Sequence, residues 1–185
     1  MEDDEQRVVE KWKLVVAAAL LAAGYYVLTI TLSSISYGEV NFRVAGLLFA
    51  FVPIFGPLSI IGLGAGQFFA NLSSPFGYLD LVSPVFGMAG LAIIFLLRGR
   101  GNLVLYGGYL SHSLLISLWV SFIISLVRGL PYLPLFYYVL IGNAVVDTGA
   151  FILYLILRSR FHESRRQESH HLAETKEANL HQYRL

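Results

Sequence analysis

Long apolar runs alternate with short polar stretches along most of this chain. The apolar runs occupy residues 14–32, 44–52, 58–70, 79–97, 103–127 and 135–157. The first run and the last three are long enough, as helices, to cross about 30 Å of hydrocarbon. The second and third are short, and they span a bilayer only if they tilt or continue as helix into the flanking residues. The pattern predicts an all-α integral membrane protein, a bundle of six transmembrane helices.

Charged residues are concentrated at the two ends of the chain. Residues 1–13 and 158–185 are densely ionic, whereas 14–157 holds few charges. We therefore expect a short N-terminal segment (1–13), a membrane domain (14–157) and a polar, disordered tail (158–185). Basic clusters at 11–13, 98–100 and 158–166 all fall on one side of an alternating six-span layout. By the positive-inside rule this side, with both termini, is cytoplasmic, and the protein is predicted to lie in the cell membrane.

Composition excludes several functions. Hydrophobic residues make up 56% and charged residues 14% of the 185, there is no cysteine, and no basic patch suits a nucleic acid. The G-x-x-x-x-G-K-[ST] loop that binds ATP phosphates is absent, as are metal-binding motifs such as H-E-x-x-H. We predict neither cofactor nor metal, and this chain is not expected to hydrolyse ATP through such a loop.

The polar residues around the two short runs suggest a binding site. Glu39 and Arg43 precede the first of these runs, whereas Asn71 and Asp80 follow the second, beyond a turn at Pro53–Pro57. If the chain goes in through one run and back through the other, these groups meet at the outward face. Polar groups that converge beside apolar walls suit a small polar ligand.

The last run carries a carboxylate at membrane depth. Asp147 lies one helical turn after Asn143, so both share a face. A charged side chain at the bilayer centre costs about 2.5–3.5 kcal/mol on insertion scales, so it needs a partner or a function. Interhelical pairing and ligand binding both remain open. A third possibility is a membrane-embedded hydrolase that uses Ser111, His112 and Asp147.

Small residues are repeated in the first run. The pairs Ala18/Ala22 and Ala19/Ala23 are each one turn apart and form a flat strip. Such strips allow another helix to approach closely. That helix could belong to this chain or to a separate subunit.

One stretch resembles a known family. The motifs are Leu28-Thr29, Gly38-Glu-Val-Asn-Phe-Arg43, Pro53, Pro57, Ile61-Gly-Leu63, Ala70-Asn-Leu-Ser73 and Gly77-Tyr-Leu-Asp80. They resemble the QueT-type queuosine-precursor transporters, which are substrate-binding S components of energy-coupling factor (ECF) transporters.

The resemblance implies a six-helix subunit that captures a queuosine precursor or another 7-deazaguanine or purine-like micronutrient from outside. It implies a transmembrane T component and two ATPase subunits as partners, with Ala18, Ala19, Ala22 and Ala23 docking the T component. The predicted ligand-reading residues are Glu39, Arg43, Asn71, Asn143 and Asp147. An S component for a different vitamin-like substrate, and a structural subunit without any ligand, are the alternatives.

The chain departs from the family pattern in two places. The family usually has a Ser-Glu pair where this chain has Ala45-Gly46. An acidic residue early in the last helix is also missing near Asn143, although Asp147 lies one turn further on. Both departures bear on the identity of the substrate.

Overall fold

The computed structural model describes residues 2–38 and 41–182, and of 2–4, 8, 10 and 161–182 it describes the backbone only. All the elements in this part are helical, which confirms the predicted all-α class. In chain order they are α1 (Glu2–Thr31), α2 (Ser33–Ser36), η1 (Val44–Phe51), α3 (Val52–Phe55), α4 (Pro57–Asn71), η2 (Gly77–Val82), α5 (Ser83–Leu97), α6 (Asn102–Arg128) and α7 (Tyr132–Gln182).

Four helical segments are long and apolar enough to cross a membrane. Among the described residues these are Glu5–Thr31, Gly77–Leu97, Asn102–Arg128 and Tyr132–Arg160, and Val44–Phe55 is a shorter apolar helix. The second predicted span starts as a 3-10 helix (η1) and becomes α-helical only at Val52. Gly56, with φ 75°, then reverses the chain, and Pro57 begins α4. Proline lacks an N–H and suits the first turn of a helix, so this sequence ends one segment and starts the next.

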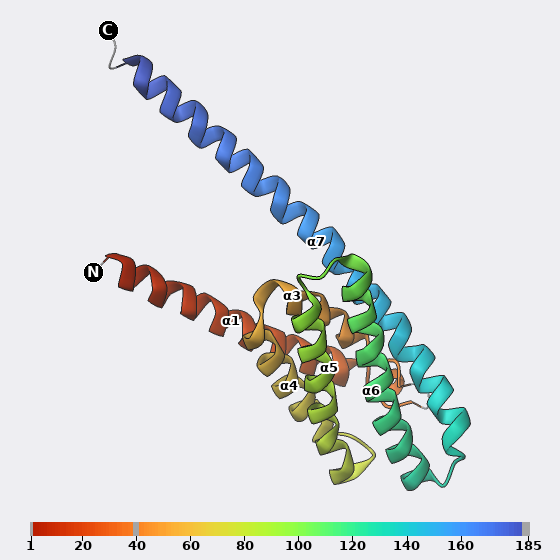
Figure 1. The fold of residues 1–185 in the computed structure, drawn as a ribbon. Coiled ribbons are helices and arrows are strands. Elements are labelled where there is room, and N and C mark those ends of the chain that lie inside the picture. The colour runs from red at the N-terminus through yellow and green to blue at the C-terminus, as the bar shows by residue number, and fades with distance from the viewer. Residues whose placement is uncertain (1, 39–40, 183–185) are drawn as a thin grey trace.

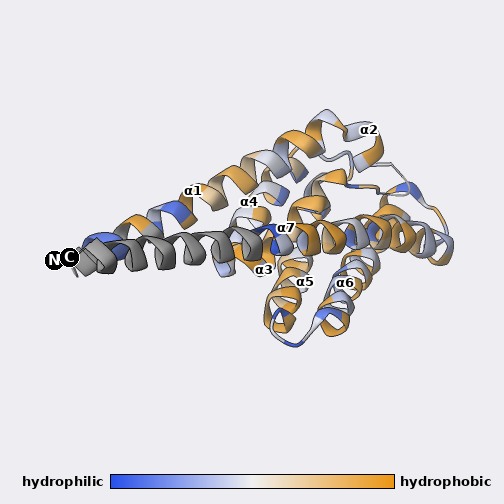
Figure 2. Ribbon diagram, turned by 90° about the horizontal axis from the view of Figure 1, so that it is seen from above, coloured by the Kyte–Doolittle hydropathy of each residue, from blue (hydrophilic) through white to orange (hydrophobic). Residues whose placement is uncertain are grey.

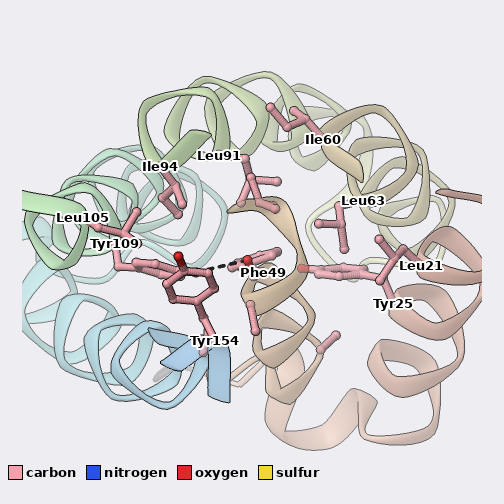
Figure 3. Close-up of a cluster of buried hydrophobic side chains, with 14 residues drawn as sticks. Leu21, Tyr25, Phe49, Ile60, Leu63, Leu91, Ile94, Leu105, Tyr109 and Tyr154 are labelled. Carbon is pink, nitrogen blue, oxygen red and sulfur yellow. Dashed lines mark hydrogen bonds between the residues drawn. The ribbon is translucent and has the colours of Figure 1, made fainter. Parts of the chain in front are cut away.

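The helices form a ring that is closed by η1. Along the ring α1 packs on α4, α4 on α5, α5 on α6 and α6 on α7, while η1 lies between α7 and α1. Figure 3 looks into this ring and shows Phe49 of η1 between Tyr25 of α1 on one side and Tyr109 and Tyr154 on the other. The Tyr109 hydroxyl donates to the Phe49 carbonyl at 3.3 Å. The short element is therefore shielded by longer helices, which removes the need for it to cross the bilayer alone.

Apolar side chains also cover the outside of the ring. Leu20 of α1, Leu96 of α5 and Ile141 of α7 are 68%, 70% and 61% exposed. The ribbons of these helices are coloured largely as hydrophobic in Figure 2. A soluble monomer rarely exposes so much contiguous apolar surface, but a lipid-facing wall requires it.

The beginning of α1 and the end of α7 project from the same side of the bundle (Figure 1). At the bundle end of that projection, Arg158 donates to the Asn102 side chain at 3.2 Å, which ties α7 to the start of α6. The backbone of α7 continues as helix to Gln182, past the predicted boundary after residue 157. No glycine or proline occurs after Gly149, so nothing in the sequence breaks the helix there.

Candidate functional site

A small cavity lies where η1 meets α1, α4, α6 and α7. Its volume is about 20 Å³, and it is lined by Tyr25, Arg43, Gly46, Phe49, Gln67, His112, Ile116, Asn143, Val146 and Asp147. Half of these side chains are polar and all of those are buried. A cavity of this size holds about one water molecule, whereas small-molecule pockets measure roughly 300–1,000 Å³. A ligand can therefore enter only if the wall moves outward.

Arg43 lines the cavity and is held in place by two residues that do not line it, Asn71 and Asp80. Its guanidinium donates to the Asn71 carbonyl oxygen at 3.0 Å and to the Asp80 carboxylate at 3.3 Å. The Asn71 amide in turn donates to the backbone oxygen of Asp80 at 2.8 Å. Ser83 donates to the second Asp80 oxygen at 2.5 Å and accepts from the Trp119 indole at 3.1 Å. The polar residues that precede the first short run and those that follow the second thus meet, as predicted, and Asn71 and Asp80 hold the Arg43 guanidinium in place.

The cavity lining also contains a buried histidine–carboxylate pair. Nδ1 of His112 lies 2.8 Å from Oδ2 of Asp147, and Ser113 donates to the same oxygen at 2.5 Å. The pair is shielded from water, since His112 is 2% and Asp147 1% exposed. Asp147 therefore has the partners that a carboxylate inside an apolar bundle needs.

Asn143 lines the cavity one turn before Asp147. Its amide donates to Ser117 Oγ at 3.3 Å and to the Val139 carbonyl at 2.9 Å. With both amide hydrogens directed at these two acceptors, the carbonyl oxygen of Asn143 is left to accept from a ligand. Ser117 belongs to a stripe of serines on α6, of which Ser113 also reaches α7.

The predicted ligand-reading residues are divided between the cavity and its support. Arg43, Asn143 and Asp147 line the cavity. Asn71 lies behind Arg43 and is bonded to it. Glu39 lies outside the described residues. Which of these residues contact a substrate stays a prediction.

Two polar lining residues were not predicted as ligand-reading. Gln67 is 4% exposed and is the one amide within the glycine-rich part of α4. A Cβ at position 87 would collide with the Gln67 side chain, so Gly87 of α5 makes room for it. A buried amide in an apolar helix was the available signal for Gln67. The sequence indicates His112 only as part of the hydrolase alternative.

The serines beside His112 are not arranged as nucleophiles. A serine nucleophile needs the free imidazole nitrogen as its base. Ser111 instead donates to the Gly107 carbonyl at 2.8 Å, and Ser113 donates to Asp147. Among the described residues, Nε2 of His112 has no hydrogen-bond partner. The pairing of His112 with Asp147 that a hydrolase requires is present, but neither Ser111 nor Ser113 is placed as its nucleophile.

The alanine strip of α1 has one side packed against α4 and another side that is exposed. Gly62 and Gly66 of α4 lie against the backbone of Ala18 and Ala22, and a Cβ at position 66 would come within 2.6 Å of the Ala22 oxygen. Ala19 and Ala23 are exposed. Ala22 and Ala23 also line an open groove between α1 and α4, of about 490 Å³, together with Tyr26, Phe69, Leu72 and Ser73. The close packing expected of the strip therefore occurs within the chain, and an outward face remains.

Comparison with known proteins gives one result. No curated protein and no solved structure matches the chain. A sequence model described as "QueT transporter" matches residues 15–159, which is most of the chain and includes the whole ring of helices around the cavity. With its several membrane-spanning helices, the chain is a multi-pass membrane protein that belongs to the QueT transporter family.

Proposed function

We propose that this chain is the substrate-capture (S) subunit of an ATP-driven ECF importer, and that it takes up a queuosine precursor or a related 7-deazaguanine or purine-like micronutrient. The observation that carries the proposal is the buried polar cavity at the centre of a QueT-family bundle. The bundle has six apolar segments around it, with both termini on the cytoplasmic side. A structural subunit without a ligand would have no need of buried polar atoms that lack a hydrogen-bond partner in the described part of the chain, such as Nε2 of His112.

The lining suits a flat, polar, uncharged heterocycle. The aromatic ring of Phe49 and the phenol of Tyr25 supply apolar faces, and their ring centroids are 6.0 Å apart. Arg43 supplies donors, Asn143 and Asp147 supply acceptors, and Gln67 can do both. A fused-ring base with donors and acceptors on its edge would satisfy these groups.

Direct binding tests this proposal. The purified protein in detergent is titrated by calorimetry with 7-deazaguanine bases, guanine and a panel of water-soluble vitamins. We expect 7-deazaguanine to bind at micromolar concentration or tighter. Asn143→Leu should weaken binding about 10- to 100-fold, since a buried partner is lost. Ile141→Ala, on the exposed face of the same helix, should leave binding unchanged.

Two outcomes would contradict different parts of the proposal. Tight binding of a vitamin, without binding of 7-deazaguanine, would retain the S component and reject the substrate. No binding of any compound would reject the capture role and favour a structural subunit.

We propose that the T component docks on the outward face of α1. Ala19 and Ala23 are exposed there, and the apolar groove beside Ala23 is wide enough for large side chains. Substituting Ala23→Leu should abolish co-purification with the T component and the two ATPase subunits. Ile141→Leu, a conservative change on the lipid-facing side of α7, should not.

A further inference from the structure

The cavity contains two buried polar atoms that have no partner. Among the described residues, neither Nε2 of His112 nor Nε of Arg43 makes a hydrogen bond, and both are shielded from water. Both residues line the cavity. A buried polar atom without a partner costs roughly 1–3 kcal/mol, so such atoms mark positions where a ligand is expected to bond.

The imidazole of His112 is held in one orientation. Its Nδ1 edge faces Asp147, and the Phe49 ring meets it edge to face, with centroids 4.8 Å apart. On the other edge, a Cβ at position 90 would lie 2.6 Å from the His112 Cδ2 atom, so the backbone of α5 limits movement there. Turning the ring over would place a carbon atom against the carboxylate. Nε2 is therefore the nitrogen that remains for a ligand.

The neighbours of Asp147 define where the imidazole proton lies. Oδ2 of Asp147 is within hydrogen-bond distance of both His112 Nδ1 and Ser113 Oγ. An ionised carboxylate accepts from both, which requires the proton on Nδ1. In the neutral imidazole Nε2 is then an acceptor, because the two ring nitrogens carry one proton between them.

We infer that His112 is a specificity-determining residue, whose Nε2 accepts a hydrogen bond from an N–H group of the ligand. Asp147 and Ser113 position it and set its tautomer. Arg43 provides the complementary donor, Nε, for a carbonyl oxygen on the same ligand. The site thus selects a ligand that carries both an N–H group and a carbonyl oxygen. The inference rests on the proposed capture function, and it adds a hydrogen-bond acceptor role for His112 and a donor role for Arg43.

Two variants of His112 separate ligand contact from support. In His112→Asn the new side-chain amide reaches the position of Nδ1 and keeps the contact with Asp147, but it offers nothing at the position of Nε2. In His112→Gln the carbonyl oxygen reaches the position of Nε2. If Nε2 reads the ligand, His112→Asn weakens 7-deazaguanine binding about 10- to 100-fold, and His112→Gln keeps most of the affinity. The reverse order, or equal loss in two folded variants, would overturn the inference.

A second measurement does not need a ligand. Nitrogen NMR of protein with isotope-labelled histidine reports which imidazole nitrogen carries the proton, and His112→Asn identifies the His112 signals. The other histidines all lie in the tail after residue 160. We expect a neutral His112 with its proton on Nδ1. A proton on Nε2, or on both nitrogens, would overturn the inference even if 7-deazaguanine binds. If 7-deazaguanine does not bind, the proposed substrate is wrong, and the NMR result alone decides the role of Nε2.

Discussion

Substituting Asp80→Asn should strongly destabilise the bundle, although it changes few atoms. Asp80 is 1% exposed and Arg43 is 8% exposed, and their closest atoms are 3.3 Å apart. The amide keeps the shape of the carboxylate and can still accept from Ser83, but it leaves the guanidinium without a counter-charge. Removing one member of a buried ion pair costs about 3–5 kcal/mol, because the remaining charge stays desolvated.

The free energy of unfolding in detergent, from denaturant titration, measures this cost. The double variant Arg43→Met/Asp80→Asn provides the control, since it removes both charges. We expect it to be more stable than Asp80→Asn alone, because the uncompensated charge is gone. A loss below about 1 kcal/mol for Asp80→Asn, typical of an exposed pair, would refute the reasoning. So would a double variant whose loss equals the sum of the two single losses.

Two further predictions concern the packing of α4. Gly66→Ala should lower the unfolding free energy by about 1–3 kcal/mol, because the new methyl group would lie 2.6 Å from the Ala22 oxygen. Gly107→Ala is the matched control, since no atom lies within 4 Å of its added methyl, and a loss as large as that of Gly66→Ala would contradict the packing argument. Tyr37→Phe should cost about 1 kcal/mol at neutral pH, since the Tyr37 hydroxyl donates to the Ala70 carbonyl at 2.6 Å. Burial raises the pKa of Tyr37, an effect that the Arg43 guanidinium partly opposes. The contribution is therefore complete below the unfolded pKa of about 10 and is lost as the pH rises through the higher folded value, so wild type and Tyr37→Phe should converge in strongly alkaline buffer. A difference that grows with pH would contradict this sign.

The apolar pattern predicted the elements well because lipid exposure imposes a simple rule. A lipid-facing helix must be apolar and continuous, and α1, α5, α6 and α7 follow that rule along their predicted runs. The pattern did not predict that Val44–Phe51 forms a 3-10 helix. This run packs against α7 and α1, so it does not need to be a continuous lipid-facing helix. The continuation of α7 beyond residue 157 was missed as well, because the tail lacks an apolar period even though its residues tolerate helix.

The sequence indicated which polar residues belong to the site, but it did not indicate which of them pair with each other. Arg43 with Asp80, and Asn143 with Asp147, stand out in the sequence because charges and amides are rare in apolar runs. That Asp147 pairs with His112, while Arg43 pairs with Asp80, depends on the rotation and relative height of α6, α7 and η1. Those quantities are set by side-chain packing across the ring, and a single sequence does not encode them in any local pattern.

The departure from the family pattern at Ala45-Gly46 falls in the wall of the cavity. Gly46 is a lining residue, and a Cβ at that position would lie 2.7 Å from Val146 of α7 and 3.2 Å from Phe49. The glycine therefore allows η1 and α7 to approach, and a glutamate there would have to occupy the space where we propose the ligand binds. Asp80 pairs with the Arg43 guanidinium, and His112 and Ser113 engage the Asp147 carboxylate through hydrogen bonds, so both acids already have partners among the described residues. On the proposed function, selection in this protein then rests on neutral hydrogen-bonding groups, namely His112, Asn143 and Gln67, which favours an uncharged base over a charged one.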